Sequence, residues 1–162
     1  MQEVVHYIGK IGEILIRQKW YLCTAESCTG GLVAHLFTNI SGSSKWFAGG
    51  LVSYSNQLKK DLLGVEEEVL KDQGAVSKEV VEVMAKGITS TCRAQVGLAI
   101  SGIAGPTGGS PDKPVGTVWM AWSLPDKVTS SQFHFSGNRL EVKEQSAYQA
   151  IENLLAILNQ IQ

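Results

Sequence analysis

Cysteine is scarce in this chain and is distributed in a way that excludes several classes of protein. The 162 residues contain three cysteines, Cys23, Cys28 and Cys92. An odd number without a Cys-x-x-Cys pair argues against a disulfide framework and against a structural zinc site, so we expect no bound metal. Reduced thiols are typical of the cytoplasm, and we expect a cytoplasmic protein.

Long apolar runs and an excess of one charge are also missing. No run reaches the length of a transmembrane helix, and the first residues, Met1 to His6, lack a signal-peptide pattern. The formal net charge is −1, which gives no electrostatic reason to bind nucleic acid or a membrane surface. We therefore expect neither as a partner.

The remaining composition suits one domain over residues 1–162. Hydrophobic residues make up 44% of the chain, enough for a single core. Apolar periodicity predicts strands at 21–25, 49–55, 96–100, 115–122 and 128–135, and helices at 32–39, 57–63, 66–72, 78–91 and 139–159 after an amphipathic opening helix. Helices between strands imply crossover connections. We predict a three-layer α/β/α sandwich with a mostly parallel sheet and an added antiparallel hairpin.

Three stretches rich in hydroxyl groups and glycine each follow a predicted strand. They are Thr24–Gly31, Tyr54–Lys59 and Ser101–Ser110. Ligands of such sheets bind beyond the carboxyl ends of the strands. Each stretch alone could be an ordinary turn with a serine or threonine helix cap, but their coincidence favours a functional site.

The first stretch places Ser27 on a tight turn between a strand and a helix. Glycines let a ligand approach the backbone, and free N–H groups at a helix start can hold an anion or a developing oxyanion. The N–H groups from Cys28 to Gly31 are the candidate oxyanion donors. We expect substrate contacts from the first and third stretches, at Thr29, Gly30, Gly31, Ser101, Gly102, Gly105 and Thr107.

The second stretch places a lysine at an unusual position. Lys59 and Lys60 fall in the first turn of the helix that Ser55 or Asn56 would cap, where the helix dipole disfavours cations. A solvated side chain explains Lys60. Lys59 is either solvated too or has a pKa lowered for a chemical purpose.

These motifs together resemble a known family. The runs TAESCTGG, GGLVSYSNQLKKDLLGV, GAVS and SGIAGPTGGSPDKPVGTVW are similar to the C-terminal domain family of CinA, whose stand-alone members resemble nicotinamide-nucleotide amidases. The resemblance covers nearly the whole chain. It implies a three-layer α/β fold and hydrolysis of the carboxamide of nicotinamide mononucleotide, a small-molecule nucleotide substrate, without metal or cofactor. We also expect a homo-oligomer.

The resemblance also implies a serine/lysine pair. Carried over by motif, the nucleophile falls on Ser27, its lysine on Lys59, the family tyrosine on Tyr54 and an anion-binding arginine on Arg139. Where the family often has aspartate and a second arginine, this chain has Asn138 and Lys143. A neutral lysine could act as the base that serine needs.

Two alternatives stay open. Cys28 stands near a helix start, which would lower its pKa and favour a cysteine nucleophile. The chain could also be a nucleotide-binding module of the same family without catalysis, because glycine-rich loops after strands serve binding equally well.

Overall fold

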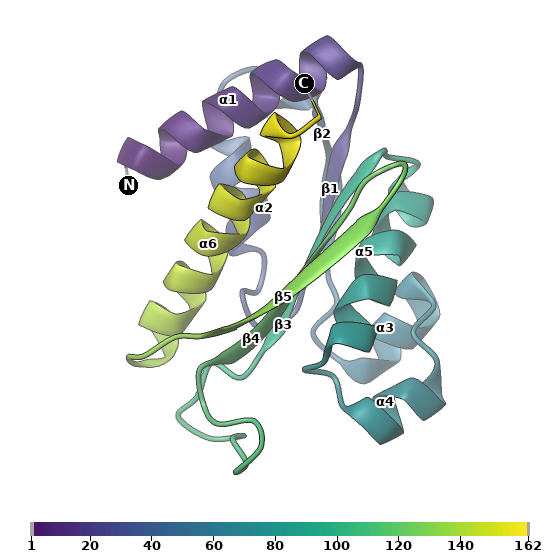
Figure 1. Cartoon of the computed structure of the whole chain (residues 1–162), viewed down its shortest axis with the longest axis vertical. Helices are drawn as coiled ribbons and strands as arrows, with labels where there is room; N and C mark the ends of the chain where they lie inside the picture. Colours follow the sequence, from purple (N-terminus) through teal and green to yellow (C-terminus); the bar gives the residue numbers. More distant parts are fainter. Residues whose placement is uncertain (1, 162) are drawn as a thin grey trace.

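The computed structural model, which describes residues 2–161, has a five-stranded mixed sheet as its central layer (Figure 1). The strands are β1 (Leu22–Glu26), β2 (Phe47–Val52), β3 (Val96–Gly102), β4 (Thr117–Ser123) and β5 (Val128–His134). They lie in the order β2-β1-β3-β4-β5. The pairs β2–β1 and β1–β3 are parallel, whereas β3–β4 and β4–β5 are antiparallel. Four strands therefore run in one direction, and β4 runs in the other.

Helices cover both faces of this sheet, as the sequence predicts. The helices are α1 (Gln2–Gln18), α2 (Leu32–Thr38), α3 (Asn56–Leu63), α4 (Glu67–Gln73), α5 (Lys78–Cys92) and α6 (Arg139–Asn159). Figure 1 shows α1, α2 and α6 on one side and α3, α4 and α5 on the other. A short 3₁₀ helix, Ser43–Lys45, precedes β2 and lies outside the sequence prediction. The three-layer α/β sandwich is confirmed.

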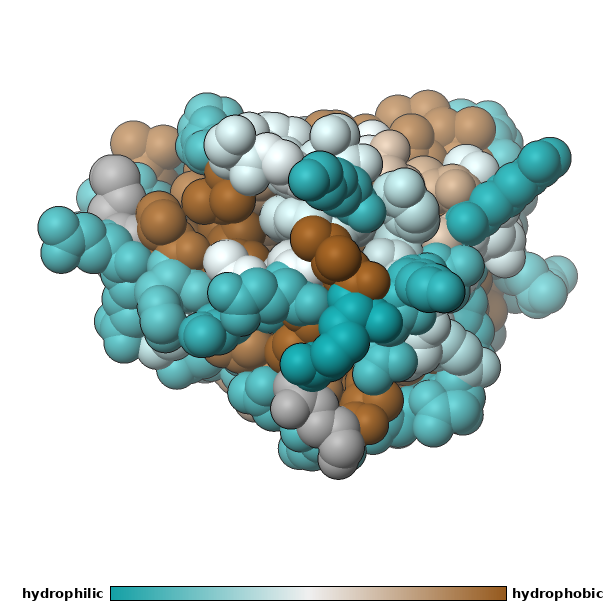
Figure 2. All heavy atoms as spheres, turned by 90° about the horizontal axis from the view of Figure 1, so that it is seen from above, coloured by the Kyte–Doolittle hydropathy of each residue, from teal (hydrophilic) through white to brown (hydrophobic). Residues whose placement is uncertain are grey.

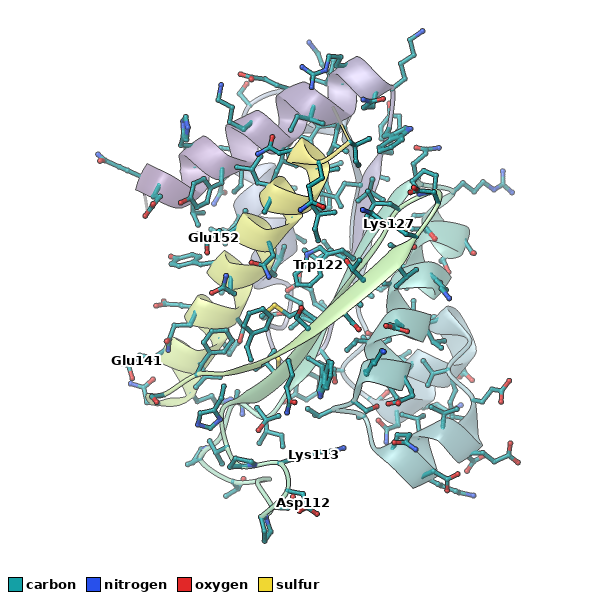
Figure 3. The ribbon with its side chains drawn as sticks, in the orientation of Figure 1. Asp112, Lys113, Trp122, Lys127, Glu141 and Glu152 are labelled. Atoms are coloured by element: carbon teal, nitrogen blue, oxygen red, sulfur yellow. The ribbon has the colours of Figure 1, made fainter. Side chains whose placement is uncertain are left out.

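Large apolar side chains fill the layer between the sheet and α1, α2 and α6. Strand alternation turns Leu98 and Ile100 of β3, and Met120 and Trp122 of β4, toward this face. Figure 3 shows Trp122 between β4 and α6, and its indole N–H donates to the carbonyl of Ala150 at 3.1 Å. This bond satisfies the polar atom of a large buried aromatic residue.

Small residues form the opposite face, on which α5 packs closely. Ala25, Ala99 and Ala121 lie there in one cluster with the apolar side of α5. A Cβ added at Gly97 would meet the carbonyl of Ala85, so only glycine permits this distance between helix and strand. The sheet is thus asymmetric, with its large side chains on one face and its close helix contact on the other.

Element boundaries differ from the prediction by a few residues at several places. The strand predicted from Val115 begins at Thr117, because Gly116 has a φ of +95° and turns the backbone out of the extended conformation. The strand predicted at 49–55 is β2 at 47–52. The closing helix is confirmed, and Asn138 with Glu141 forms the predicted capping box. Within the described residues, no helix combines the length and apolarity that crossing a membrane requires.

Candidate active site

The carboxyl ends of β1, β2 and β3 bring the three polar stretches together. A pocket of about 290 Å³ lies there. Six of the predicted residues line it, namely Ser27, Tyr54, Gly102, Gly105, Thr107 and Arg139, together with Cys28. Lys59 lies against Ser27. Thr29, Gly30, Gly31 and Ser101 are not among the lining residues.

Ser27 and Lys59 are in direct contact. Lys59 Nζ donates to Ser27 Oγ at 3.1 Å and to the backbone carbonyls of Ser53 at 2.7 Å and Tyr54 at 3.3 Å. Ser55 caps α3 by accepting from the N–H of Leu58, which fixes where the helix begins. Lys59, the fourth residue of α3, is thereby aimed back at the turn after β1.

The Lys59 amine is buried in a way that favours its neutral form. The residue is 1% exposed, and burial lowers its pKa below the ordinary value, while the nearby Cys28 acts in the opposite direction. Within the described chain no carboxylate lies at salt-bridge distance from it. A lysine held by carbonyl and hydroxyl oxygens, without a counter-ion, suits a general base.

Arg139 links the second and third polar stretches at the mouth of the pocket. Its Nη1 donates to the carbonyl of Gly105 at 2.8 Å, and its Nη2 donates to the Tyr54 hydroxyl at 2.9 Å. Neither acceptor is charged, so these two bonds do not offset the positive charge of the guanidinium. The Tyr54 phenol is thus directed to Arg139, whereas it is the Tyr54 carbonyl that contacts the lysine.

Lys143 adds a second cation near the Ser27 turn. Its Nζ lies 3.6 Å from where a Cβ would stand on Gly30. One helical turn separates it from Arg139 on α6. Together they give this end of the sheet a positive character that would attract an anionic ligand.

Cys28 does not have the properties of a nucleophile. It is 5% exposed, and burial raises the pKa of its thiol to about 12, whereas its own backbone N–H and the charges of Lys143 and Lys59 act in the opposite direction. A thiol with that pKa is not ionised near neutral pH, and the thiolate is the reactive form. This burial argues against the cysteine alternative, because its effect on the thiol pKa exceeds the lowering that a helix start would give.

The sequence prediction missed Glu26, the last residue of β1. Its buried carboxylate accepts hydrogen bonds from the Thr29 hydroxyl at 2.6 Å and from the N–H groups of Gly31, Val33 and Ala34 at 3.1, 3.1 and 2.8 Å. The available signal was an acidic residue shortly before a helix start, where the dipole favours it.

Glu26 changes the expectation for the glycine-rich turn. The sequence places substrate on Thr29, Gly30 and Gly31, but the first and last of these donate to Glu26, and the Gly30 N–H donates to the Ser27 carbonyl at 3.1 Å. These groups build the turn and do not face the pocket. Between residues 2 and 161, neither the Cys28 N–H nor the Thr29 N–H donates to a backbone carbonyl, and the Cys28 N–H interacts with its own thiol. Of the four N–H groups expected to bind an oxyanion, these two remain as candidates.

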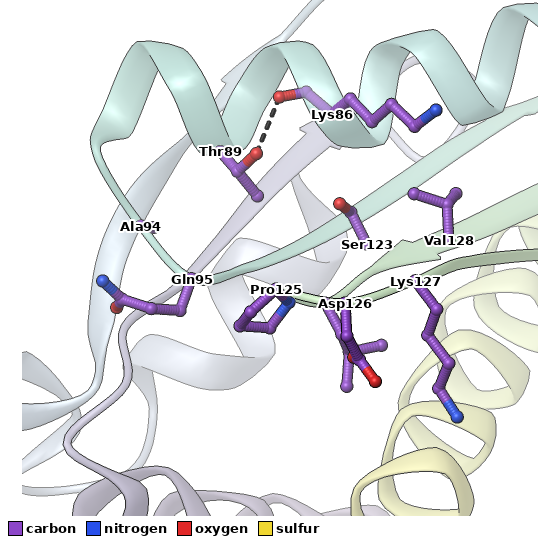
Figure 4. Close-up of a pocket in the computed structure, with 10 residues that line it drawn as sticks. Lys86, Thr89, Ala94, Gln95, Ser123, Pro125, Asp126, Lys127 and Val128 are labelled. Atoms are coloured by element: carbon purple, nitrogen blue, oxygen red, sulfur yellow. Dashed lines mark hydrogen bonds between the residues drawn. The ribbon is translucent and has the colours of Figure 1, made fainter.

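A larger pocket, of about 620 Å³, lies at the opposite end of the sheet (Figure 4). It is bounded by the β4–β5 turn and the C-terminal half of α5, with Thr89, Gln95, Ser123 and Lys127 among its lining residues. The Thr89 hydroxyl donates to the Lys86 carbonyl at 2.7 Å. Its lining residues contain no nucleophile paired with a base, so size alone does not make it the site.

Comparison with known proteins gives a consistent result. The model of the CinA C-terminal domain matches residues 6–158. A protein named nicotinamide-nucleotide amidohydrolase PncC from Pseudomonas putida is 45% identical over 97% of this chain and 98% of its own length. A CinA-like protein from Thermotoga maritima is 45% identical over 90% of this chain but only 36% of its own length.

Solved structures agree with the fold. The competence damage-inducible protein A (ComA) from Klebsiella pneumoniae has a TM-score of 0.94 at 32% identity, covering 98% of this chain and 99% of that one. The competence/damage inducible protein CihA from Agrobacterium tumefaciens has a TM-score of 0.92 at 38% identity, covering 96% and 95%.

Proposed function

The chain belongs to the CinA C-terminal domain family, and from that premise we propose that it is a nicotinamide-nucleotide amidohydrolase. It hydrolyses the carboxamide of nicotinamide mononucleotide to nicotinate mononucleotide and ammonia. The observation that carries the proposal is the buried contact of 3.1 Å between Lys59 Nζ and Ser27 Oγ. The name of the Pseudomonas putida relative supports the substrate.

In the first step Ser27 attacks the carboxamide carbon. Neutral Lys59 accepts the hydroxyl proton as the new C–O bond forms, and the carbonyl oxygen becomes an oxyanion. The Cys28 N–H, which follows the nucleophile directly, donates to that oxyanion. Protonated Lys59 is held by the carbonyls of Ser53 and Tyr54.

In the second step the C–N bond breaks. Lys59 returns its proton to the departing nitrogen, which leaves as ammonia, and an ester joins Ser27 to the nicotinoyl group. Lys59, neutral again, takes a proton from water as the water attacks the ester. The proton goes back to Ser27 Oγ as the ester C–O bond breaks, and the acid product gives its remaining proton to solvent to become the carboxylate. One lysine thus serves as base and acid in turn.

The substrate phosphate lies on the cationic side of the pocket. Arg139 and Lys143 supply charge there, and the loop that contains Gly105 and Thr107 supplies backbone donors. Because Glu26 already occupies the donors at the start of α2, that helix end is not the phosphate site. Tyr54, bonded to Arg139 at 2.9 Å, contacts the substrate between phosphate and ring.

An ammonia-release assay tests this function. Nicotinamide mononucleotide, nicotinamide riboside and free nicotinamide are compared with the parent protein and with Ser27→Ala. We expect ammonia from the mononucleotide far above the other two, and none with Ser27→Ala. Binding of the mononucleotide without ammonia release would contradict the proposal and indicate a binding module.

A further inference from the structure

Glu26 lies beside the proposed nucleophile in sequence but on the other side of the sheet. Alternation along β1 puts Leu22 and Glu26 toward the layer of α1, α2 and α6, while Ala25 faces α5. The Ser27–Lys59 contact is made with α3, on the side of α5. Glu26 is 1% exposed, so its carboxylate meets neither solvent nor the pocket.

The negative charge of the Glu26 carboxylate is stabilised by hydrogen-bond donors without a charged partner among the described residues. It accepts the Thr29 hydroxyl and three N–H groups at the start of α2, where Gly31 is an N-cap without a capping side chain. In the described chain, no lysine, arginine or histidine lies at salt-bridge distance from it. An internal anion thus takes the place that a ligand anion takes in other glycine-rich turns.

These bonds hold the turn that carries Ser27 from both sides. The Ser27 N–H donates to the Ile100 carbonyl of β3 at 2.9 Å. Two residues further on, the Thr29 hydroxyl donates to Glu26 at 2.6 Å, the usual distance for a hydroxyl bound to a carboxylate. The backbone between these points therefore has little freedom, and this backbone sets the direction of Ser27 Oγ and of the Cys28 N–H.

We propose that Glu26 is a positioning residue for the serine/lysine reaction. It keeps Ser27 Oγ within hydrogen-bond distance of Lys59, and it keeps the Cys28 N–H turned toward the oxyanion. The inference rests on the proposed function for the reaction that Ser27 performs. It can nevertheless be tested without the nucleotide, through the reactivity of Ser27 itself.

The experiment measures the rate at which a fluorophosphonate, a serine-directed phosphonylating reagent, modifies Ser27. Parent, Glu26→Gln and Glu82→Gln are compared per mole of folded protein. Glu82 is a matched control, since this part-buried carboxylate accepts from Ser130 at 2.7 Å and lies on α5. We expect Glu26→Gln to lose at least about ten-fold in rate, because small misplacements of a reacting group have large effects. Glu82→Gln should react like the parent.

In the ammonia-release assay with nicotinamide mononucleotide, Glu26→Gln should have a lower kcat, while its KM should change by less than about three-fold. If folded Glu26→Gln reacts with the reagent at the parent rate, Glu26 is a helix cap only and the inference is overturned. A parent that reacts with the fluorophosphonate but releases no ammonia contradicts the proposed substrate and leaves the Glu26 comparison valid.

If Glu26→Gln fails to fold, Thr29→Val and Thr29→Ser test the same role of Glu26 through its bond to the Thr29 hydroxyl. Thr29→Val removes the hydroxyl bond to Glu26 and leaves the three N–H bonds in place. We expect it to slow the reagent by about three-fold or more, and Thr29→Ser to restore the rate. Folded Thr29→Val that reacts like the parent would overturn the inference.

Discussion

Lys59 Nζ and Ser27 Oγ lie 3.1 Å apart although 32 residues separate them in the chain. The serine comes from the turn after β1 and the lysine from α3 after β2, so the contact exists only because these two strands are parallel neighbours. The lysine is buried and has no carboxylate partner in the described part of the chain. Four expectations about activity follow from this pair and its surroundings.

The rate should rise with pH and then reach a plateau. Only the neutral amine of Lys59 accepts a proton, and burial lowers its pKa from the ordinary value of 10.5. The neutral fraction, and with it kcat/KM, therefore increases as pH passes through the lowered pKa and is constant above it. A kcat/KM profile measured with the mononucleotide checks this. A rise centred at or above pH 10.5, or a profile without any rise, would contradict a lysine base of lowered pKa.

Arg139→Ala should raise KM for the mononucleotide by about ten-fold or more, since a hydrogen bond to a charged group contributes roughly 1.5–3 kcal/mol. The riboside, which lacks the phosphate, is the control, because Arg139 also holds Gly105 and Tyr54. The loss should be specific to the mononucleotide. Equal losses with both substrates would indicate that Arg139 only organises the loops.

Cys28→Ala should fold and keep a kcat within about three-fold of the parent. The buried thiol has a pKa of about 12 and does not ionise near neutral pH, and the backbone N–H proposed as oxyanion donor remains in the variant. Ammonia release by the purified variant is the measurement. An inactive Cys28→Ala of unchanged unfolding midpoint would restore the cysteine mechanism.

Much of the fold follows from local patterns. The closing helix begins and ends at the predicted residues because its capping box and apolar stripe are both local. Strand ends were less predictable, as at Thr117, where a single glycine conformation decides the boundary. The meeting of the three polar stretches followed from one topological rule about parallel strands.

Sequence reasoning missed two features of the site. The donors of Glu26 are local, but they converge on its carboxylate only because the chain folds back through Gly31 and Ala34 over the end of β1. The sequence pattern of a glycine-rich turn looks the same whether its anion is a ligand or an internal carboxylate. Likewise, the burial of Cys28 against Gly102 depends on β3 and reverses the effect expected of a helix start.

The most direct test of the serine/lysine pair is kcat for Lys59→Arg beside Lys60→Arg. Arginine keeps the positive charge but does not deprotonate near neutral pH, so Lys59→Arg should lose nearly as much activity as Lys59→Ala, about 1,000-fold or more. Lys60 Nζ pairs with Glu67 Oε2 at 3.1 Å and does not line the pocket. Lys60→Arg should therefore keep the parent kcat. A folded Lys59→Arg enzyme with the parent kcat would contradict the mechanism.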